Sequence, residues 1–307
     1  MYQVMLISNP MAGSVSPRHK EVIVNALRAD FKLEVADTEG RNHATELARD
    51  AVDRGFDAVL AFGGDGTINE AAQGVIGSDT ALGTLPGGTA NVLARSIGIP
   101  RDPIDATAYI AHRLRSGQTQ RINVGRVNER YFIFSCGMGL DAEVVKRVES
   151  DPEGKARKRD WLYVKKLLRA GVLDYSRRKP QITFTPILSP PAPGEPIRVV
   201  STVCCNARPF TYLKNLPVDV CPLAQLDKGL DFLSLDRIPL WTFPGLAWGM
   251  LKSRKHIDRK HATYLHDTSG GILEADVPLP VQADGDYLGE VTRAEITLVP
   301  HALDLLV

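Results

Sequence analysis

The stretch 57–70 limits the fold of this chain more than any other; its sequence is Asp-Ala-Val-Leu-Ala-Phe-Gly-Gly-Asp-Gly-Thr-Ile-Asn-Glu. The apolar run 58–62 is typical of a buried parallel strand. Glycines at 63, 64 and 66 favour a sharp turn with exposed backbone N–H groups. Thr67 and Glu70 fit a capping box, so we expect a helix to begin there. A strand, a glycine turn and a helix start together predict a phosphate-binding site.

Asp65 is unexpected in a turn that binds phosphate, because its carboxylate repels the ligand unless a cation lies between them. We therefore expect Mg²⁺ to accompany the phosphate. The alternative is a tight strand–helix turn in which Asp65 only caps an N–H group. Neither standard glycine motif fits. Asn69 stands where a dinucleotide-binding motif has its third glycine, and no Gly-Lys-Ser/Thr follows.

The composition is that of a globular protein. The 307 residues are enough for one large or two ordinary domains. The net charge of +1 does not favour nucleic acid, and we expect no nucleic-acid partner. The four cysteines match no zinc motif and include an adjacent pair, so a reduced, cytoplasmic setting is the simplest interpretation. We expect neither a secretion signal nor a membrane-spanning helix.

Strands and helices alternate over residues 1–120. We expect strands at 2–8, 33–36, 58–62 and 81–85, and helices starting at Ser16, at 44–54, after the glycine turn, at 92–97 and at 103–114. This alternation predicts an α/β domain with a doubly wound parallel sheet. The loops 9–14, 37–42, 63–67 and 86–91 each follow a strand. They are therefore expected at the carboxyl edge of the sheet, where such sheets bind ligands.

The pattern changes near residue 120, and residues 121–307 are expected to form an antiparallel β-sandwich domain. Expected strands are 121–127, 130–136, 181–187, 198–204, 230–235 and 295–299. The tail 294–307 either stays in this domain or returns to the first. Asp284-Gly285-Asp286 is typical of a hairpin turn. Its carboxylates either stabilise the turn, act as a general base, or bind a metal, and spacing does not separate these options.

Two segments combine basic and aromatic residues. Residues 155–179 hold ten Lys or Arg against two Asp, with Trp161, Tyr163 and leucines between them. Residues 240–260 carry Trp241, Phe243 and Trp248, followed by a basic run. Such segments either form solvated helix faces or contact a membrane surface. We carry the membrane contact forward as an expectation.

Several motifs in order resemble the diacylglycerol kinase catalytic-domain family, which includes bacterial lipid kinases and sphingosine kinases. The motifs are Asn9-Pro10 with Gly13, Gly63-Gly64-Asp65-Gly66-Thr67 with Asn69-Glu70, Pro86-Gly87-Gly88-Thr89-Ala90-Asn91, Gly139-Leu140-Asp141-Ala142-Glu143-Val144 and Asp284-Gly285-Asp286. The glycine–aspartate turn is shared with NAD kinases, but the ordered set is specific to lipid kinases and spans nearly the whole chain.

The resemblance implies an α/β nucleotide domain and a β-sandwich, with ATP and Mg²⁺ as cofactors and a lipid hydroxyl as phosphate acceptor. It places the following residues at ATP: Asn9, Gly13, Thr38, Gly63, Gly64, Asp65, Gly66, Thr67, Glu70, Gly88 and Thr89. It further implies that Asp65 acts on the phosphates through Mg²⁺. Asp141 would join the metal–water network or orient the acceptor, and Asp284 or Asp286 would be the general base.

Three positions depart from the family pattern. Asp286 stands where Glu is usual, so the reach of its carboxylate is one methylene shorter. Val92 follows Asn91 where many members have Asp. Bacterial members hold a structural Mg²⁺ in a loop that here reads Leu226-Asp227-Lys228-Gly229-Leu230-Asp231. Lys228 occupies a ligand position, so Asp227 or Asp231 would have to bind the metal, or Lys228 would replace its charge.

The sequence therefore predicts an Mg²⁺-dependent kinase that transfers the γ-phosphate of ATP to a lipid hydroxyl, at the cytoplasmic face of a membrane. The alternatives are an NAD kinase-like enzyme and a nucleotide-binding sensor without catalysis. The acceptor lipid and the oligomeric state, a homodimer included, stay open.

Overall fold

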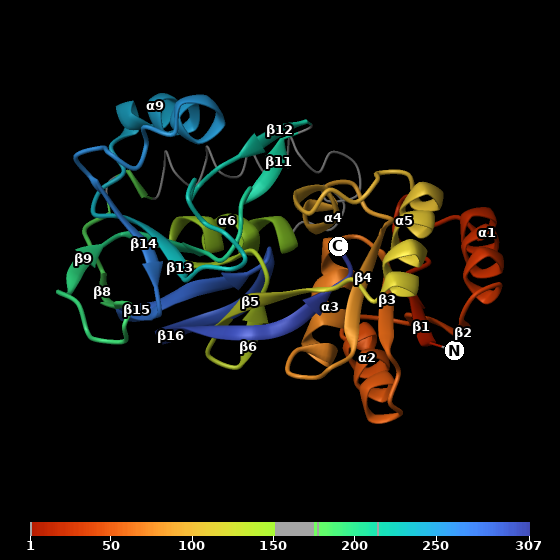
Figure 1. The fold of residues 1–307 in the computed structure, drawn as a ribbon. Helices are drawn as coiled ribbons and strands as arrows, with labels where there is room; N and C mark the ends of the chain where they lie inside the picture. Colours follow the sequence, from red (N-terminus) through yellow and green to blue (C-terminus); the bar gives the residue numbers. More distant parts are fainter. Residues whose placement is uncertain (1, 151–174, 177, 214) are drawn as a thin grey trace. The chain divides into compact units, whose positions relative to one another are not determined.

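A computed structural model describes residues 2–150, 175–176, 178–213 and 215–307 of the chain. The fold divides into two compact units (Figure 1). The first comprises residues 1–123 and 300–307, and the second comprises residues 124–299. The last eight residues thus pack with the first unit: the N–H of Leu306 donates to Leu82 O over 3.0 Å, and that of Gly77 donates to Ala302 O over 2.8 Å.

The first unit contains a parallel sheet. Its strands are β1 (Gln3–Ser8), β2 (Lys32–Asp37), β3 (Ala58–Gly63) and β4 (Ala81–Pro86). They lie in the order β2-β1-β3-β4, and the end of β16 (Asp286–Leu305) joins β4 in parallel at Leu305 and Leu82. Strands β3 and β4 are buried along their whole length, as continuous apolar runs in a covered parallel sheet should be. The expected parallel α/β domain is confirmed.

Helices pack in pairs around this sheet. They are α1 (Pro17–Arg28), α2 (His43–Asp53), α3 (Asp65–Val75), α4 (Val92–Ser96) and α5 (Pro103–Ser116). Helix α1 packs beside α5, and α2 packs beside α3. The second pair approaches closely at Gly74, where an added Cβ would lie 2.5 Å from the Cβ of Ala48. Ser16 and Asp102 cap α1 and α5, each before a proline at the first helical position.

The expected capping box at Thr67 and Glu70 is wrong. Helix α3 begins two residues earlier, at Asp65, and Gly64 is its N-cap without any side-chain hydrogen bond. Thr67 is instead buried inside the first turn, where it receives a hydrogen bond from Asn9. The first N–H groups of a helix have no acceptor within it, and the N-cap Gly64 has no side chain to supply one.

The second unit is built mainly from antiparallel strands, as expected. They are β5 (Gln120–Val127), β6 (Arg130–Phe132), β7 (Ser135–Met138), β8 (Ile182–Ile187), β9 (Ile197–Val199), β10 (Ser201–Cys205), β11 (Thr211–Leu213), β12 (Leu216–Val218), β13 (Leu230–Leu235), β14 (Ala262–Thr268), β15 (Gly270–Ala283) and β16. The main order is β14-β13-β10-β7-β15-β16, with β8 beside β15. Its apolar core includes Phe132, Phe184 and Phe232.

The expected strand 130–136 is broken into β6 and β7. The physical reason is that the backbone N–H groups of Ile133 and Phe134 donate to the carboxylate of Asp284, so these two residues do not continue a regular ladder. The expected strand 198–204 is likewise divided at Val200, whose N–H donates to Leu235 O over 2.8 Å.

Helices of the second unit include α6 (Leu140–Glu149), which the strand-rich pattern did not lead us to expect, α9 (Phe243–Trp248), and two short turns, η2 (Leu240–Thr242) and η3 (Gly249–Ser253). Leu140, Val144 and Val148, spaced four residues apart, form the buried face of α6 and are the signal that could have predicted it. None of the helices that the structure describes could cross a membrane, since none combines the length with the apolarity required.

Candidate functional site

The loops that follow β1 and β3 lie next to each other in the first unit. In the order β2-β1-β3-β4, the chain reverses its direction of winding between β1 and β3, and ligands bind at such a reversal point. Asn9, just after β1, spans the two loops. Its Nδ2 donates to Thr67 Oγ1 over 3.0 Å, and its Oδ1 accepts the N–H of Met11 at the same distance. The sequence-predicted residues Asn9 and Thr67 are therefore brought together.

The two glycine turns pack backbone against backbone. Gly87 N donates to Gly63 O over 2.7 Å. A Cβ on Gly88 would lie 2.6 Å from Gly64 Cα, and one on Gly63 would lie 2.6 Å from Thr67 Oγ1. Glycine is required at these positions because any side chain would push the turns apart. The result is a surface of main-chain groups without side chains, which suits a polyanion.

Asn91 holds the second glycine turn in shape. Its backbone is left-handed (φ 46°), its Oδ1 accepts the N–H of Gly88 over 2.9 Å, and its Nδ2 donates to Gly88 O over 2.8 Å. Asparagine tolerates this conformation better than most residues do. This supporting role was not predicted, although an Asn just before a helix is a recognisable turn signal.

Asp65 links the two glycine turns. Its Oδ1 accepts the backbone N–H of Val92 over 2.6 Å, at the start of α4. The carboxylate is half-buried in the first turn of α3, where the helix dipole stabilises negative charge. The N–H-capping role that the sequence left open is thus present. It does not by itself account for a charged group at this point, because a neutral acceptor would bind the same N–H.

The other residues expected at ATP surround these turns. Thr38 follows β2 and donates its N–H to Ser8 O over 2.8 Å, and Gly13 has open space where a Cβ would stand. Thr89 is exposed on the second turn. Glu70 lies one turn further along α3, where its carbonyl oxygen accepts a hydrogen bond from the Thr45 hydroxyl. Gly66 is exposed at the start of α3.

Asp284 in the second unit is an anchored carboxylate. Its Oδ1 accepts the N–H groups of Phe134 and Ser135, each over 2.9 Å, and its Oδ2 accepts that of Ile133 over 2.7 Å. Asp284 and Gly285 both have positive φ, which makes the expected hairpin turn between β15 and β16 a two-residue turn. Three amide donors fix the position of the Asp284 carboxylate in the turn.

Asp286 occupies a different environment on the same turn. Its carboxylate is partly exposed and lies 3.3 Å from the guanidinium of Arg130. Arg130 was not predicted as a site residue. Its only sequence signal is a basic side chain just after the Asn128-Glu129 turn. The two candidate bases therefore differ in their surroundings: Asp284 is bound by three backbone amides, whereas Asp286 is partly exposed beside Arg130.

Asp141 lies in the first turn of α6 and is tied to the same hairpin through Gln282. Gln282 is buried; its Nε2 donates to Asp141 Oδ2 over 3.0 Å, and its Oε1 accepts the N–H of Gly285 over 2.9 Å. Asp141 Oδ1 is buried without a hydrogen-bond partner among the described residues. Burial raises the pKa of the Asp141 carboxyl to about 6, against the opposing effect of the Gln282 hydrogen bond.

Gln282 was missed as a functional candidate. The signal for it is a polar residue inside the apolar strand segment Val281-Gln282-Ala283, where an amide needs a specific partner. Gly137 adds a second constraint, since a Cβ there would lie 2.0 Å from Asp141 Oδ2.

Residues 3–127 match the family model described as the diacylglycerol kinase catalytic domain. A diacylglycerol kinase of Bacillus subtilis is 35% identical over 49% of this chain. The match spans 50% of that relative's own length. A diacylglycerol kinase of Mycobacterium tuberculosis (strain H37Rv) is 28% identical over 99% of this chain and 94% of its own length.

Residues 3–127 thus form a domain of the diacylglycerol kinase catalytic domain family. A crystal structure of a diacylglycerol kinase from Bacillus anthracis has the same fold, with a TM-score of 0.74 at 20% identity. The match covers 99% of this chain and 96% of that one. The glycine turns, Asn9 and Asp65 all lie within the matched residues 3–127 of the diacylglycerol kinase domain.

The structural Mg²⁺ that the resemblance implies at Asp227 or Asp231 does not fit the loop as the structure describes it. Asp231 is fully buried. Its Oδ1 is 2.8 Å from His266 Nδ1 and accepts the N–H of Asp267 over 3.0 Å, while its Oδ2 accepts the Tyr264 hydroxyl. Asp227 is exposed. The described residues contain no group of three or more His, Cys, Asp or Glu suited to a metal ion. We propose no metal at this loop.

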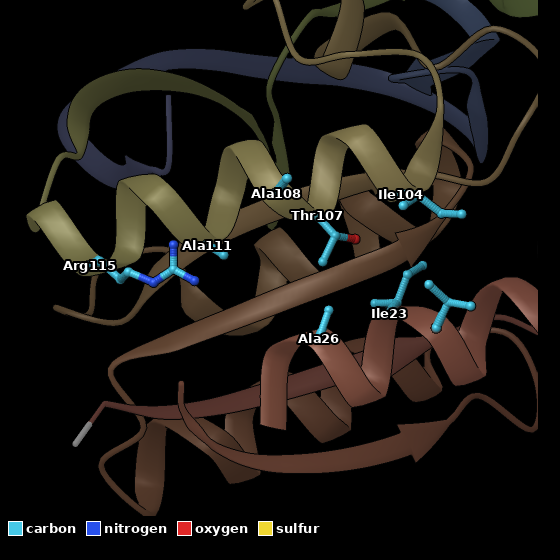
Figure 2. Close-up of a pocket in the computed structure, with 8 residues that line it drawn as sticks. Ile23, Ala26, Ile104, Thr107, Ala108, Ala111 and Arg115 are labelled. Atoms are coloured by element: carbon cyan, nitrogen blue, oxygen red, sulfur yellow. The ribbon is translucent and has the colours of Figure 1, made fainter. Parts of the chain in front are cut away.

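An apolar pocket of about 240 Å³ lies between α1 and α5 of the first unit (Figure 2). Ile23 and Ala26 of α1 face Ile104, Thr107 and Ala111 of α5 there. None of the residues expected at ATP or at the acceptor of the diacylglycerol kinase reaction lines this pocket, and we assign it no part in the site.

Proposed function

We propose that this protein is an ATP-dependent lipid kinase that transfers the γ-phosphate of ATP to a lipid hydroxyl, with Mg²⁺ as the metal. The observation that carries the proposal is the joined pair of glycine turns. Asn9 bonded to Thr67, Asp65 bonded to the N–H of Val92, and the contact of Gly64 with Gly88 gather three loops into one amide-rich surface.

The phosphates of ATP would bind the main-chain N–H groups at the start of α3 and in the second glycine turn. The helix dipole and the N–H groups of the first turn of α3 favour a negative ligand there. The close glycine contacts support this assignment, because they bring the main-chain groups of the two turns together without intervening side chains. Thr38, Gly13 and Thr89, at the rim of these loops, would contact the rest of the nucleotide.

Asp65 fits the role of the side chain that would hold Mg²⁺. It is a hard oxygen donor in a surface otherwise suited to anions, and that is the donor type Mg²⁺ takes from proteins. Bound there, the ion would neutralise phosphate charge. Asp65 would in addition keep the two glycine turns in register through its bond to the N–H of Val92.

Asp286 would be the general base. In the proposed transfer the acceptor oxygen bonds to the γ-phosphorus, the bond from that phosphorus to the bridging oxygen of ADP breaks, and the hydroxyl proton passes to the Asp286 carboxylate. Asp284 would act as the support of the turn, because its three amide bonds stabilise its charge and fix its position. Gln282 would position Asp141 relative to this turn.

The match of residues 3–127 to the diacylglycerol kinase catalytic domain supports a lipid with a hydroxyl group as the acceptor. A lipid of this kind stays in a bilayer, so the enzyme has to work at a membrane surface. We infer that residues 240–260 take part in this contact. The other segment expected at the membrane, 155–179, lies mostly outside the described residues.

The purified chain, incubated with labelled ATP, Mg²⁺ and either a total lipid extract or NAD, tests the proposal. We expect label in a lipid species and none in NAD. Label in NAD instead would establish an NAD kinase-like enzyme, a class that shares the glycine–aspartate turn. Nucleotide binding without transfer to either acceptor would contradict the kinase proposal and favour a nucleotide-binding sensor without catalysis.

A further inference from the structure

We propose that the face formed by α9 and the basic run after it, residues 241–260, docks on a bilayer rich in anionic phospholipid. Trp241 and Trp248 would enter the headgroup region, and the basic side chains would contact lipid phosphates. The proposal rests on the proposed function, because a lipid acceptor requires the enzyme to reach a bilayer.

Both tryptophans of this segment are on the surface. Trp241 is 83% exposed and Trp248 is 62% exposed, and they are the most exposed aromatic side chains that the structure describes among the large hydrophobic residues. Tryptophan is large and apolar, with a single N–H, so full exposure to water is unfavourable. Tryptophan is enriched at sites where one end of the ring contacts apolar groups and the other end contacts water. Two such rings seven residues apart present an apolar surface that the described residues leave largely uncovered.

The segment is nevertheless firmly seated on the second unit. Leu246 of α9 is buried in a cluster with Leu140, Val144 and Ile238, and Phe243 packs partly against it. Behind η3, the fully buried His256 packs on Gly249 and its Nε2 lies 2.8 Å from Val220 O. The inner face therefore meets the fold, and the exposed rings belong to the outer face of an ordered element.

The run after α9 supplies positive charge beside the rings. Its exposed basic residues are Lys252, Arg254, Lys255, Arg259 and Lys260, against one acidic residue, Asp258. Arg254 is partly neutralised by Asp219, 3.3 Å away. Arg259 returns to α9, since a Cβ on Gly245 would lie 2.0 Å from its Nη2. Basic and aromatic groups thus share one region rather than lying on separate faces.

This charge excess points to an anionic bilayer rather than to an apolar protein groove. The whole chain has a net charge of only +1, so the basic excess is local. Each Lys or Arg near an anionic leaflet strengthens binding roughly fivefold. Amphipathic interfacial segments combine this attraction with burial of Trp and Leu at the headgroup boundary.

Co-sedimentation of the full chain with vesicles, without ATP, tests the surface. We expect binding to vesicles that contain phosphatidylglycerol, weaker binding to pure phosphatidylcholine, and loss of binding as salt rises. Trp241→Ala with Trp248→Ala should weaken binding at least about tenfold. Lys252→Glu should weaken it roughly 25-fold, since it replaces one attraction by one repulsion.

Matched controls are Val277→Ala, which truncates another exposed hydrophobic residue of the second unit, and Lys32→Glu on β2. Neither should change vesicle binding. Equal binding by the wild type and the α9 variants would overturn the proposal. Absence of wild-type binding to any vesicle would overturn it as well, and would leave the tryptophans to a protein partner.

The binding assay separates this proposal from the proposed function, because it involves no turnover. If vesicle binding depends on Trp241 and Trp248 but the protein phosphorylates no lipid, the docking proposal stands and the lipid kinase proposal is rejected. In an active enzyme, the α9 variants should lose activity on a long-chain acceptor in vesicles and keep it on a short-chain, water-soluble acceptor. Equal loss on both acceptors would count against a docking role.

Discussion

Asp65 and Asp284 are both carboxylates bound by backbone amides, but their surroundings give them different capacities. Asp65 accepts one N–H, from Val92, at a helix start where amides favour anions. Asp284 accepts three N–H groups on a tight turn. The first arrangement leaves a charge near a surface for phosphate, whereas the second uses the charge to hold the chain. Residue types alone do not distinguish these roles.

Asp65→Asn should abolish phosphate transfer from ATP and leave the fold intact. The amide oxygen of Asn can still accept the N–H of Val92, so the two glycine turns stay joined while the negative charge is lost. Turnover with Mg²⁺ and the thermal unfolding midpoint are the two measurements. Near-normal turnover in a folded variant would show that the charge at this position is not needed.

Asp286→Asn and Asp284→Asn should separate catalysis from stability. Loss of the base at Asp286 should slow transfer by on the order of 10²–10⁴-fold with little change in stability. Asn at residue 284 presents an NH₂ group to backbone donors, so that variant should lose about 1–3 kcal/mol of unfolding free energy. Denaturant titration and single-turnover rates measure both quantities. The reverse pattern would exchange the two roles.

At the scale of elements, the carboxyl ends of β1, β3 and β4 act together because their loops touch. The loops after β3 and β4 meet through main-chain contacts between glycines, so they tolerate no added side chain at the point of approach. Gly66, one position into α3, differs: no atom lies within 4 Å of where its Cβ would stand. The two kinds of glycine should respond in opposite ways to the same substitution.

Gly88→Ala should destabilise the fold by about 1–3 kcal/mol, because the new Cβ would lie 2.6 Å from Gly64 Cα, a backbone atom. Gly66→Ala is the matched control. It should be neutral or stabilising by up to about 1 kcal/mol, since alanine favours a helix interior. Denaturant unfolding of the two variants gives the comparison. A Gly88→Ala protein as stable as the wild type would mean that the turns do not pack as described.

At the scale of the whole molecule, the residues proposed for ATP belong to the first unit, and the carboxylates proposed for the acceptor belong to the second. Each set is held by contacts within its own unit. Asp141 is the titrating member of the second set, because its pKa of about 6 lies well above the usual value of 3.8. Its ionisation should therefore be visible in the stability of the protein.

Stability should depend on pH through Asp141 in a defined direction. The raised pKa means that the folded state binds the proton more tightly than the unfolded state does. The stabilisation is therefore complete below about pH 4 and is lost as pH rises from about 4 to about 6. In metal-free buffer, the unfolding free energy of the wild type relative to Asp141→Asn should fall as pH rises from about 4 to about 6. Above about pH 6 this difference should stay constant. A difference that does not vary with pH would contradict the raised pKa.

The sequence by itself determined the parallel α/β half, the antiparallel half, the glycine turns and the hairpin at Asp284-Gly285, because each depends on residues close together in the chain. Prediction from the sequence failed where a local pattern competes with a contact to a residue that is distant in the chain. Thr67 fits a cap but is taken by Asn9, and the strand 130–136 is broken by a carboxylate 150 residues away. Strand order, which sets the loops that meet, and burial, which sets the pKa of Asp141, depend on how distant segments pack. Only the tertiary structure decided them.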